Sequence, residues 1–378
     1  FPGFDEPWES KTFSSLYRYV NEKNDGSFSV EHIISVANMY FKTDARITDE
    51  DYLKTYNIFK LGDIAFEGNK SKDFAFGRFV ENTIGDGIVS HVFVVFRPVN
   101  LSHNLGYWKY AINNENVMGR ILARCTKKTT MMTNLVTSDF LEQTICCPSP
   151  DEQAHIATFL SLIDIRIKKQ EQLIETLKKY KRGLLSFMFE EITVIDEAAS
   201  TTYLFAEIAL RRKEKYNPEC GVEYPCVELE HIEQATGQIL GTVSSTAQNS
   251  IKTVAKPGDV LFSKLRPYLR KFAFVERDMV CSSEIWAFMP TIHVLPKYLY
   301  YLIQTEHFLR VANISSGTKM PRAEWANIEK EEFDIPCPAV QAQTVTVLEA
   351  IDKKIALADK TLLALSQIKV GLLQQLFI

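Results

Sequence analysis

The sequence predicts an α+β protein in which two mixed α/β modules are separated by two long antiparallel helices that form a coiled coil, with an internal pseudo-twofold repeat. Three observations support this. Residues 148–189 and 336–377 are related at a constant offset of 188 residues, with 15 identities in 42 ungapped positions. Both copies carry a heptad stripe, and the segments outside them are nearly equal in length. The expected domains are 1–147, 148–189, 190–336 and 337–378.

The first module, 1–147, has the pattern of a mixed α/β domain. Residues 62–66 (GDIAF) indicate a turn followed by a short apolar strand, and residues 90–98 indicate a strand that ends at proline. Residues 106–123 have a helical pattern. The expected order is therefore strands followed by helix.

The helix that follows has a good start signal, because Ser149 and Glu152 have capping-box spacing and Pro150 occupies the first helical position. Its apolar seam repeats at alternating spacings of four and three, which is typical of a coiled coil. The seam positions are Ile156, Leu160, Ile163, Ile167, Gln170, Ile174, Leu177, Lys181, Leu184 and Met188.

The second module, 190–336, repeats the local patterns of the first. Residues 258–262 (GDVLF) match the earlier turn and strand, residues 282–290 match the strand ending at proline, and residues 298–309 are helical. The last helix begins at Pro338, and its seam keeps the register of the first. Two long helices with matching narrow seams favour packing on each other, although packing of each helix on its own module is the simpler alternative.

Composition excludes several classes of protein. With 46% hydrophobic and 24% charged residues, the chain is an ordinary folded protein. Seven cysteines without a CxxC pair indicate reduced thiols and a cytoplasmic location. No apolar run is long enough for a membrane helix and no secretory signal is expected. Because the net charge is −4, any DNA-binding surface must be local.

Catalytic motifs are absent from the sequence. Residues 62–71 lack the spacing of a P-loop, and no HExxH, GxSxG or adenine-methyltransferase signature occurs. We interpret His155 as a surface or packing histidine. No catalytic residue, cofactor or metal ion is therefore expected.

Four features resemble the DNA specificity (S) subunit of type I restriction-modification systems. They are the opening FPGF…W, the two P-x-P-x-x-Q helix starts, the K-x-G-L-L-x-x-x-F helix ends and GDVLFSKLRPYLRK at 258–271. Val340 departs from the pattern, since it replaces the acidic residue found at Glu152. The resemblance implies two target-recognition domains that each read half of a split site, joined by helices that act as spacer and docking surface.

The same resemblance implies the partners. They are double-stranded DNA, modification (methyltransferase) subunits in two copies and, for cleavage, ATP-dependent restriction (translocase/nuclease) subunits, with no catalysis by the chain itself. Two rival interpretations stay open: a coiled-coil scaffold without a DNA role, and an enzyme with an unrecognised nuclease or methyltransferase motif.

Candidate DNA-binding residues are cations and small polar residues in loops. In the second module they are Lys264, Arg266, Tyr268, Arg270 and Lys271, then Ser316, Gly317, Thr318, Lys319 and Arg322. In the first module they are Asn69, Lys70, Lys72 and Arg78, then Lys127, Lys128 and Thr129. A further basic run at 211–215 contains Glu214 and is equally consistent with an ordinary surface strand.

Overall fold

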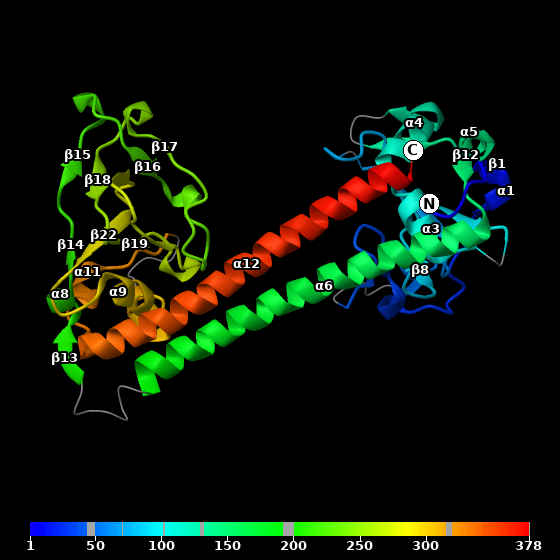
Figure 1. The fold of residues 1–378 in the computed structure, drawn as a ribbon. Helices are drawn as coiled ribbons and strands as arrows, with labels where there is room; N and C mark the ends of the chain where they lie inside the picture. The colour runs from blue at the N-terminus through cyan, green and yellow to red at the C-terminus, as the bar shows by residue number, and fades with distance from the viewer. Residues whose placement is uncertain are drawn as a thin grey trace. The chain divides into compact units, whose positions relative to one another are not determined.

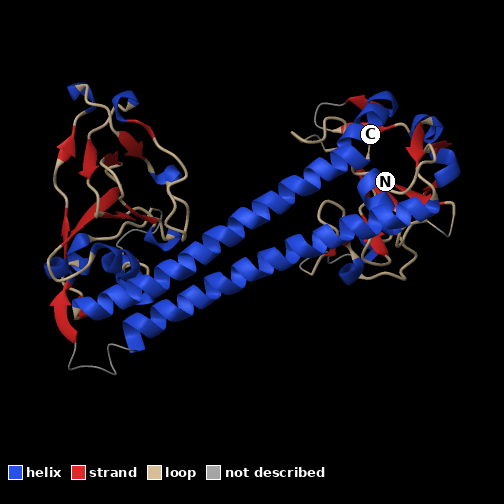
Figure 2. Cartoon of the chain, viewed as in Figure 1, coloured by secondary structure: helices blue, strands red, loops and turns tan. Residues whose placement is uncertain are grey.

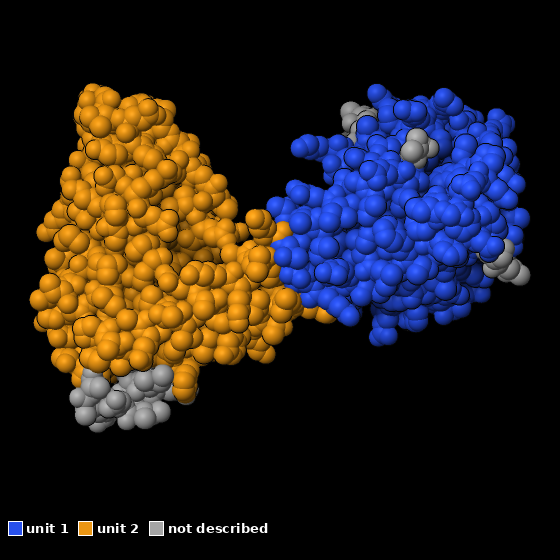
Figure 3. All heavy atoms as spheres, in the orientation of Figure 1, with its two compact units in different colours: residues 1–171, 361–378 blue, residues 172–360 orange. Residues whose placement is uncertain are grey.

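The computed structural model describes residues 1–43, 50–69, 71–100, 103–128, 132–191, 200–314 and 320–377. The chain forms two compact units, of which unit 1 comprises residues 1–171 and 361–378 and unit 2 comprises residues 172–360 (Figure 3). Each unit contains part of both long helices. Helices and strands are mixed in both units (Figure 2). The predicted α+β class is confirmed.

Unit 1 is built around a four-stranded antiparallel sheet of order β2-β9-β6-β7. A two-stranded ribbon, β1-β12, joins the two ends of the module. The elements before the first long helix are β1 (Glu9–Thr12), α1 (Phe13–Leu16), β2 (Tyr17–Val20), η1 (Val30–His32), β3 (Ile34–Ser35), β4 (Tyr40–Phe41), α2 (Glu50–Leu53), β5 (Asn57–Phe59), β6 (Ile64–Glu67), β7 (Arg78–Glu81), β8 (Gly87–Val89), β9 (Val94–Pro98), α3 (Leu105–Ala111), α4 (Glu115–Cys125), β10 (Thr126–Lys128), β11 (Thr133–Leu135), α5 (Thr137–Glu142) and β12 (Thr144–Cys147).

Unit 2 repeats this arrangement with the sheet order β14-β22-β19-β20 and the ribbon β13-β23, and it adds a five-stranded sheet, β15-β18-β21-β16-β17. Its elements are β13 (Ser200–Leu204), α8 (Phe205–Ile208), β14 (Ala209–Arg211), β15 (Lys215–Tyr216), η4 (Pro218–Cys220), β16 (Pro225–Val227), η5 (Leu229–His231), β17 (Val243–Ser244), η6 (Ser245–Ala247), β18 (Lys252–Ala255), β19 (Val260–Ser263), η7 (Pro267–Leu269), β20 (Phe272–Phe274), β21 (Met279–Cys281), β22 (Ile285–Pro290), α9 (Pro296–Leu302), α10 (Glu306–Ala312), α11 (Trp325–Ile328) and β23 (Glu332–Pro336).

The helical stretches expected at 106–123 and 298–309 are each two helices separated by a turn. Asn114 accepts a hydrogen bond from the Asn116 amide and starts α4, and Thr305 accepts one from the Phe308 amide and starts α10. A side chain that caps a new helix competes with continuation of the old one, so each stretch breaks there.

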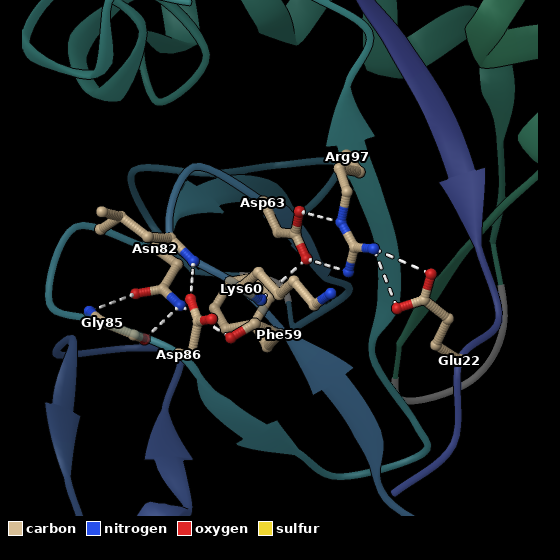
Figure 4. Close-up of polar contacts among 9 residues, drawn as sticks. Glu22, Phe59, Lys60, Asp63, Asn82, Gly85, Asp86 and Arg97 are labelled. Carbon is tan, nitrogen blue, oxygen red and sulfur yellow. Dashed lines mark hydrogen bonds and ion pairs between the residues drawn. The ribbon is translucent and has the colours of Figure 1, made fainter. Parts of the chain in front are cut away.

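The turn that opens the second sheet strand holds a buried aspartate in both units, Asp63 in unit 1 (Figure 4) and Asp259 in unit 2. In unit 1, Asp63 accepts the Lys60 amide and a bidentate pair from Arg97 at 2.8 and 2.9 Å. In unit 2, Asp259 is paired in the same way with Arg212 at 2.6 and 2.8 Å. The arginine comes from β9 in one unit and from the residue after β14 in the other.

The two long helices are α6 (Pro150–Ser186) and α12 (Pro338–Leu376) (Figure 1). Every predicted seam position of both helices is buried or half-buried. Each helix begins in the core of one unit and ends in the core of the other: Leu160 and Phe377 lie in the unit 1 core, and Leu185 and Leu348 lie in the unit 2 core. No described helix has the length and apolar character needed to cross a membrane.

A pair of equivalent ion pairs joins the helices, one within each unit. Asp164 of α6 contacts Lys369 of α12 at 2.6 Å in unit 1, and Lys181 of α6 contacts Asp352 of α12 at 2.7 Å in unit 2. From Asp164 to Lys181, α6 advances by the same number of residues as separate Lys369 from Asp352 in the reverse direction along α12. The helices are therefore antiparallel and both contacts share one register, as the matching seams predict.

A tyrosine from each module completes these contacts. The Tyr110 hydroxyl of α3 donates to Asp164, and the Tyr301 hydroxyl of α9 donates to Asp352 at 2.9 Å. Burial of Asp164 is outweighed by the hydrogen bonds from Lys369 and Tyr110, which hold the pKa of its carboxyl below the ordinary value. Each Tyr–Asp–Lys triad thus ties a module helix to both long helices.

Candidate nucleic-acid interface

The densest basic cluster of the sequence forms the 264–271 loop between β19 and β20. Two of its residues, Arg266 and Arg270, have left-handed backbone with φ of 50°, and they bound the single turn η7. Such backbone is unfavourable for a side chain larger than glycine and persists only where the surroundings hold it. The loop is therefore a defined shape and not a random surface turn.

Backbone hydrogen bonds attach this loop to two neighbouring segments. The Arg266 amide donates to the Pro321 carbonyl at 2.8 Å, and the Ala323 amide donates to the Lys264 carbonyl at 2.7 Å. The Lys264 amide donates to the Glu284 carbonyl at 3.0 Å. The structure thus brings the loop and the predicted residue Arg322 together, although they are far apart in sequence.

The cations of this cluster are not equivalent. Arg270 pairs with Glu306 at 2.8 Å, Arg322 pairs with Glu284 at 3.1 Å, and the Lys271 ammonium donates to the Leu229 carbonyl at 2.6 Å. Lys264 and Arg266 form no ion pair with any described residue, and Arg266 is exposed. Tyr268 is also exposed, with 52% of its surface accessible. These three side chains are available to a ligand.

Unit 1 has the corresponding loop, residues 68–77, between β6 and β7. It lies against the β10-β11 hairpin: the Thr133 amide donates to the Gly68 carbonyl at 2.8 Å, and Asn69 pairs with Met132. A side chain at Gly68 would put a Cβ 2.2 Å from the Thr133 carbonyl oxygen, so only glycine allows this approach.

The predicted cations of unit 1 lie on these two segments. Lys72 and Lys127 are exposed, and the exposed Lys128 has its ammonium 5.7 Å from the centroid of the Phe76 ring. Arg78 is engaged, since it pairs with Glu67 at 2.8 Å and donates to the Ala37 carbonyl. The predicted residues Lys70, Thr129, Ser316, Gly317, Thr318 and Lys319 lie outside the described residues.

The two units therefore have the same arrangement of loops at the candidate interface. In each, the loop after the equivalent strand, β6 or β19, lies beside a segment that follows the second module helix, α4 or α10. Cations of both segments gather at that edge of the sheet. An edge with exposed lysines, arginines and a tyrosine can contact phosphates and base edges of DNA.

The basic run at 211–215 was noted in the sequence, but its first residue, Arg211, was not chosen as a DNA-binding candidate. Arg211 is the last residue of β14, and its guanidinium carbon lies 4.6 Å from the Trp325 ring centroid and 5.6 Å from that of Trp286. Strand alternation is the signal that could have found it, because it separates Arg211 from Arg212, whose guanidinium is committed to Asp259.

Comparison with known proteins identifies the class. Residues 204–367 match the family described as type I restriction modification DNA specificity domain. The resemblance of the chain to type I specificity subunits is therefore confirmed.

Three relatives illustrate the resemblance. The HindI specificity subunit of Haemophilus influenzae is 29% identical over 135 residues, which cover 34% of this chain and 29% of that protein. The EcoDI specificity subunit of Escherichia coli is 24% identical over 311 residues, which cover 70% of this chain and 65% of that one. The chain thus spans less than two thirds of either relative. The crystal structure of the type I S subunit from M. genitalium has a TM-score of 0.57 at 17% identity and matches all of this chain and 98% of that one, which is a likeness of fold.

Proposed function

We propose that the chain is the DNA specificity subunit of a type I restriction-modification complex, without catalysis of its own. Each module reads one half of a bipartite target, while partner subunits methylate the DNA and ATP-dependent restriction subunits cleave it. The observation that carries this proposal is the duplicated interface, in which equivalent sheet edges of the two units carry cation-bearing loops.

A DNA surface in either module has to depend on local clusters of cations, because neither module is basic overall. Residues 1–147 hold 16 basic and 18 acidic side chains, and residues 191–336 hold 16 and 20, so neither module attracts DNA through its net charge. Binding must come from cations that pair with no carboxylate of the described residues, such as Lys264 and Arg266. Lysine suits phosphate as a point charge, whereas arginine can bind a guanine edge with two hydrogen bonds.

The experiment that tests the proposed function is methylation mapping. We expect the chain, expressed with its modification subunits, to direct adenine methylation to one bipartite sequence. Activity of the isolated chain with S-adenosylmethionine or with magnesium would support the enzyme interpretation instead. A complex that assembles but shows neither sequence preference nor dependence of binding on salt would support the scaffold interpretation.

The first prediction follows from the proposal that each module reads its own half-site. Replacing Lys264 and Arg266 by alanine should lower the salt dependence of binding by about one unit of slope for each phosphate that the side chains no longer neutralise. Where a side chain instead binds a base, its removal should cost roughly 1 to 3 kcal/mol at that base position, and only in the half-site read by residues 190–336. Binding titrations at several salt concentrations and methylation mapping measure the two effects.

Arg270→Ala is the matched comparison, because its guanidinium already has a carboxylate partner in Glu306. It should have the smaller effect on binding. Loss of discrimination in the other half-site, or an unchanged salt slope in the double variant, would contradict this placement of the DNA surface.

The long helices offer a docking surface for the modification subunits. Outside the seam, α6 exposes Phe159 and Tyr180, and at the equivalent repeat positions α12 exposes Val347 and Ile368. Exposed apolar side chains at helical spacing mark protein interaction surfaces more often than isolated ones do. Because the surface is duplicated, it offers two equivalent sites.

The second prediction follows from this duplication. Native mass spectrometry of the active methyltransferase should give two modification subunits for each copy of the chain. Changing Tyr180 and Ile368 together to glutamate should weaken both sites and release the modification subunits, without disturbing the buried seam. A fully active complex with one modification subunit, or a double variant that still holds two, would contradict this.

A further inference from the structure

Arg211 has an arrangement that its neighbours in sequence lack. Its guanidinium lies against the rings of Trp325 and Trp286, whose centroids are 6.0 Å apart at an interplanar angle of 79°. No described residue accepts a hydrogen bond from this guanidinium or forms an ion pair with it. Burial lowers its pKa from the ordinary value, but an arginine so placed keeps its charge. Five N–H donors are thus held in place with no acceptor among the described residues.

Both indoles belong to segments that hold the 264–271 loop. Trp286 lies two residues after Glu284, whose carbonyl accepts the Lys264 amide and whose carboxylate pairs with Arg322. Trp325 begins α11, which lies beside β14 and β22 (Figure 1). β14 runs in the same direction as β19, and strand register places Arg211 level with Val260 through Phe288. Its guanidinium extends toward the 264–271 loop over Trp286, which pairs with Phe262 of β19.

The two modules differ at this place. Strand register aligns Arg211 of β14 with Tyr19 of β2, since their neighbouring strands end at the equivalent prolines, and it aligns Trp286 with Val94. Tyr19 is exposed and its ring contacts Phe96. A residue needed for the shared fold would be the same in both units, whereas residues that read two different half-sites must differ.

We propose that Arg211, oriented by Trp286 and Trp325, hydrogen-bonds the major-groove edge of a guanine in the half-site read by the second module. This rests on the DNA specificity function proposed above. Two parallel N–H groups of a guanidinium match O6 and N7 of guanine, and indole packing fixes the side chain before DNA arrives. Arg211 is then a specificity-determining residue, and the two tryptophans are positioning residues.

The test uses the full chain in complex with its modification subunits. The target is first mapped for the wild-type complex, and methylation rates are then measured on duplexes changed at one position at a time. With Arg211→Ala, preference for one G·C pair in the second module's half-site should fall about 10- to 100-fold, while the other half-site is read as before. Arg211→Lys keeps the charge but not the paired donors, so it should lose the same preference with a smaller loss of affinity.

Arg277→Ala is the control, because Arg277 is exposed and follows β20, the edge strand of the sheet opposite β14. It should leave all preferences unchanged. A uniform loss of affinity with a reduced salt slope would assign Arg211 to a phosphate and overturn the proposal. Unchanged discrimination in folded Arg211→Ala or Arg211→Lys complexes would also overturn it. So would a target in which the second module's half-site contains no G·C pair. Failure of the wild-type complex to methylate any specific sequence would instead overturn the proposed function itself, and this proposal with it.

Discussion

Replacing Ile351 by aspartate is expected to destabilise the chain by about 3 to 5 kcal/mol, because it places a carboxylate in the helix seam without a partner. Ile351 is 8% exposed and its neighbour in the seam, Leu348, is fully buried in the core of unit 2. A charge introduced among such apolar side chains is poorly solvated. Urea denaturation followed by circular dichroism measures the change in the free energy of unfolding.

Ala350→Asp is the matched control, since Ala350 is exposed and adjacent on the same helix. It introduces the same charge outside the seam, so it should cost only about 0.5 to 1 kcal/mol through lower helix propensity. Equal destabilisation by the two variants would show that the seam does not hold the helices together.

Removing the carboxylate of Asp352 should have the next largest effect. In Asp352→Ala the ammonium of Lys181, whose side chain is 11% exposed, loses its ion-pair partner, and the Tyr301 hydroxyl loses its acceptor. A poorly solvated charge without a partner costs more than an exposed pair contributes, so we expect a loss of about 2 to 3 kcal/mol. The midpoint and slope of urea unfolding measure it.

The repeat supplies the control for this experiment. Asp164→Ala removes the equivalent carboxylate, but Lys369 is 30% exposed and can be hydrated, so the expected loss is only about 1 kcal/mol. Folding lowers the pKa of Asp164, so its contribution is present at neutral pH and is lost as the pH falls through the acidic range of that carboxyl. Asp352→Asn keeps an acceptor for Tyr301 and should fall between the two. Identical losses for both alanine variants would contradict the argument from burial.

Much of the architecture was predictable because it is periodic or duplicated. A seam that repeats every three or four residues specifies a helix face, and a second copy in the same register supplies its partner, so the antiparallel pair followed from the sequence. The echo of GDIAF in GDVLF located equivalent strands, and the loops after them carry the predicted Lys264 and Lys72. Such signals are local, and neighbouring residues alone determine them.

Only the tertiary structure decided which of these residues are free. Sequence gives no sign that Arg270 faces Glu306, that Arg78 faces Glu67, or that Arg211 rests on two indoles while Arg212 binds Asp259. These interactions join residues far apart in the chain, and they depend on which strand pairs with which and in what register. A shift of one residue would turn every side chain of β14 to the other face of the sheet, so the chemistry of this edge is set by strand pairing and not by local pattern.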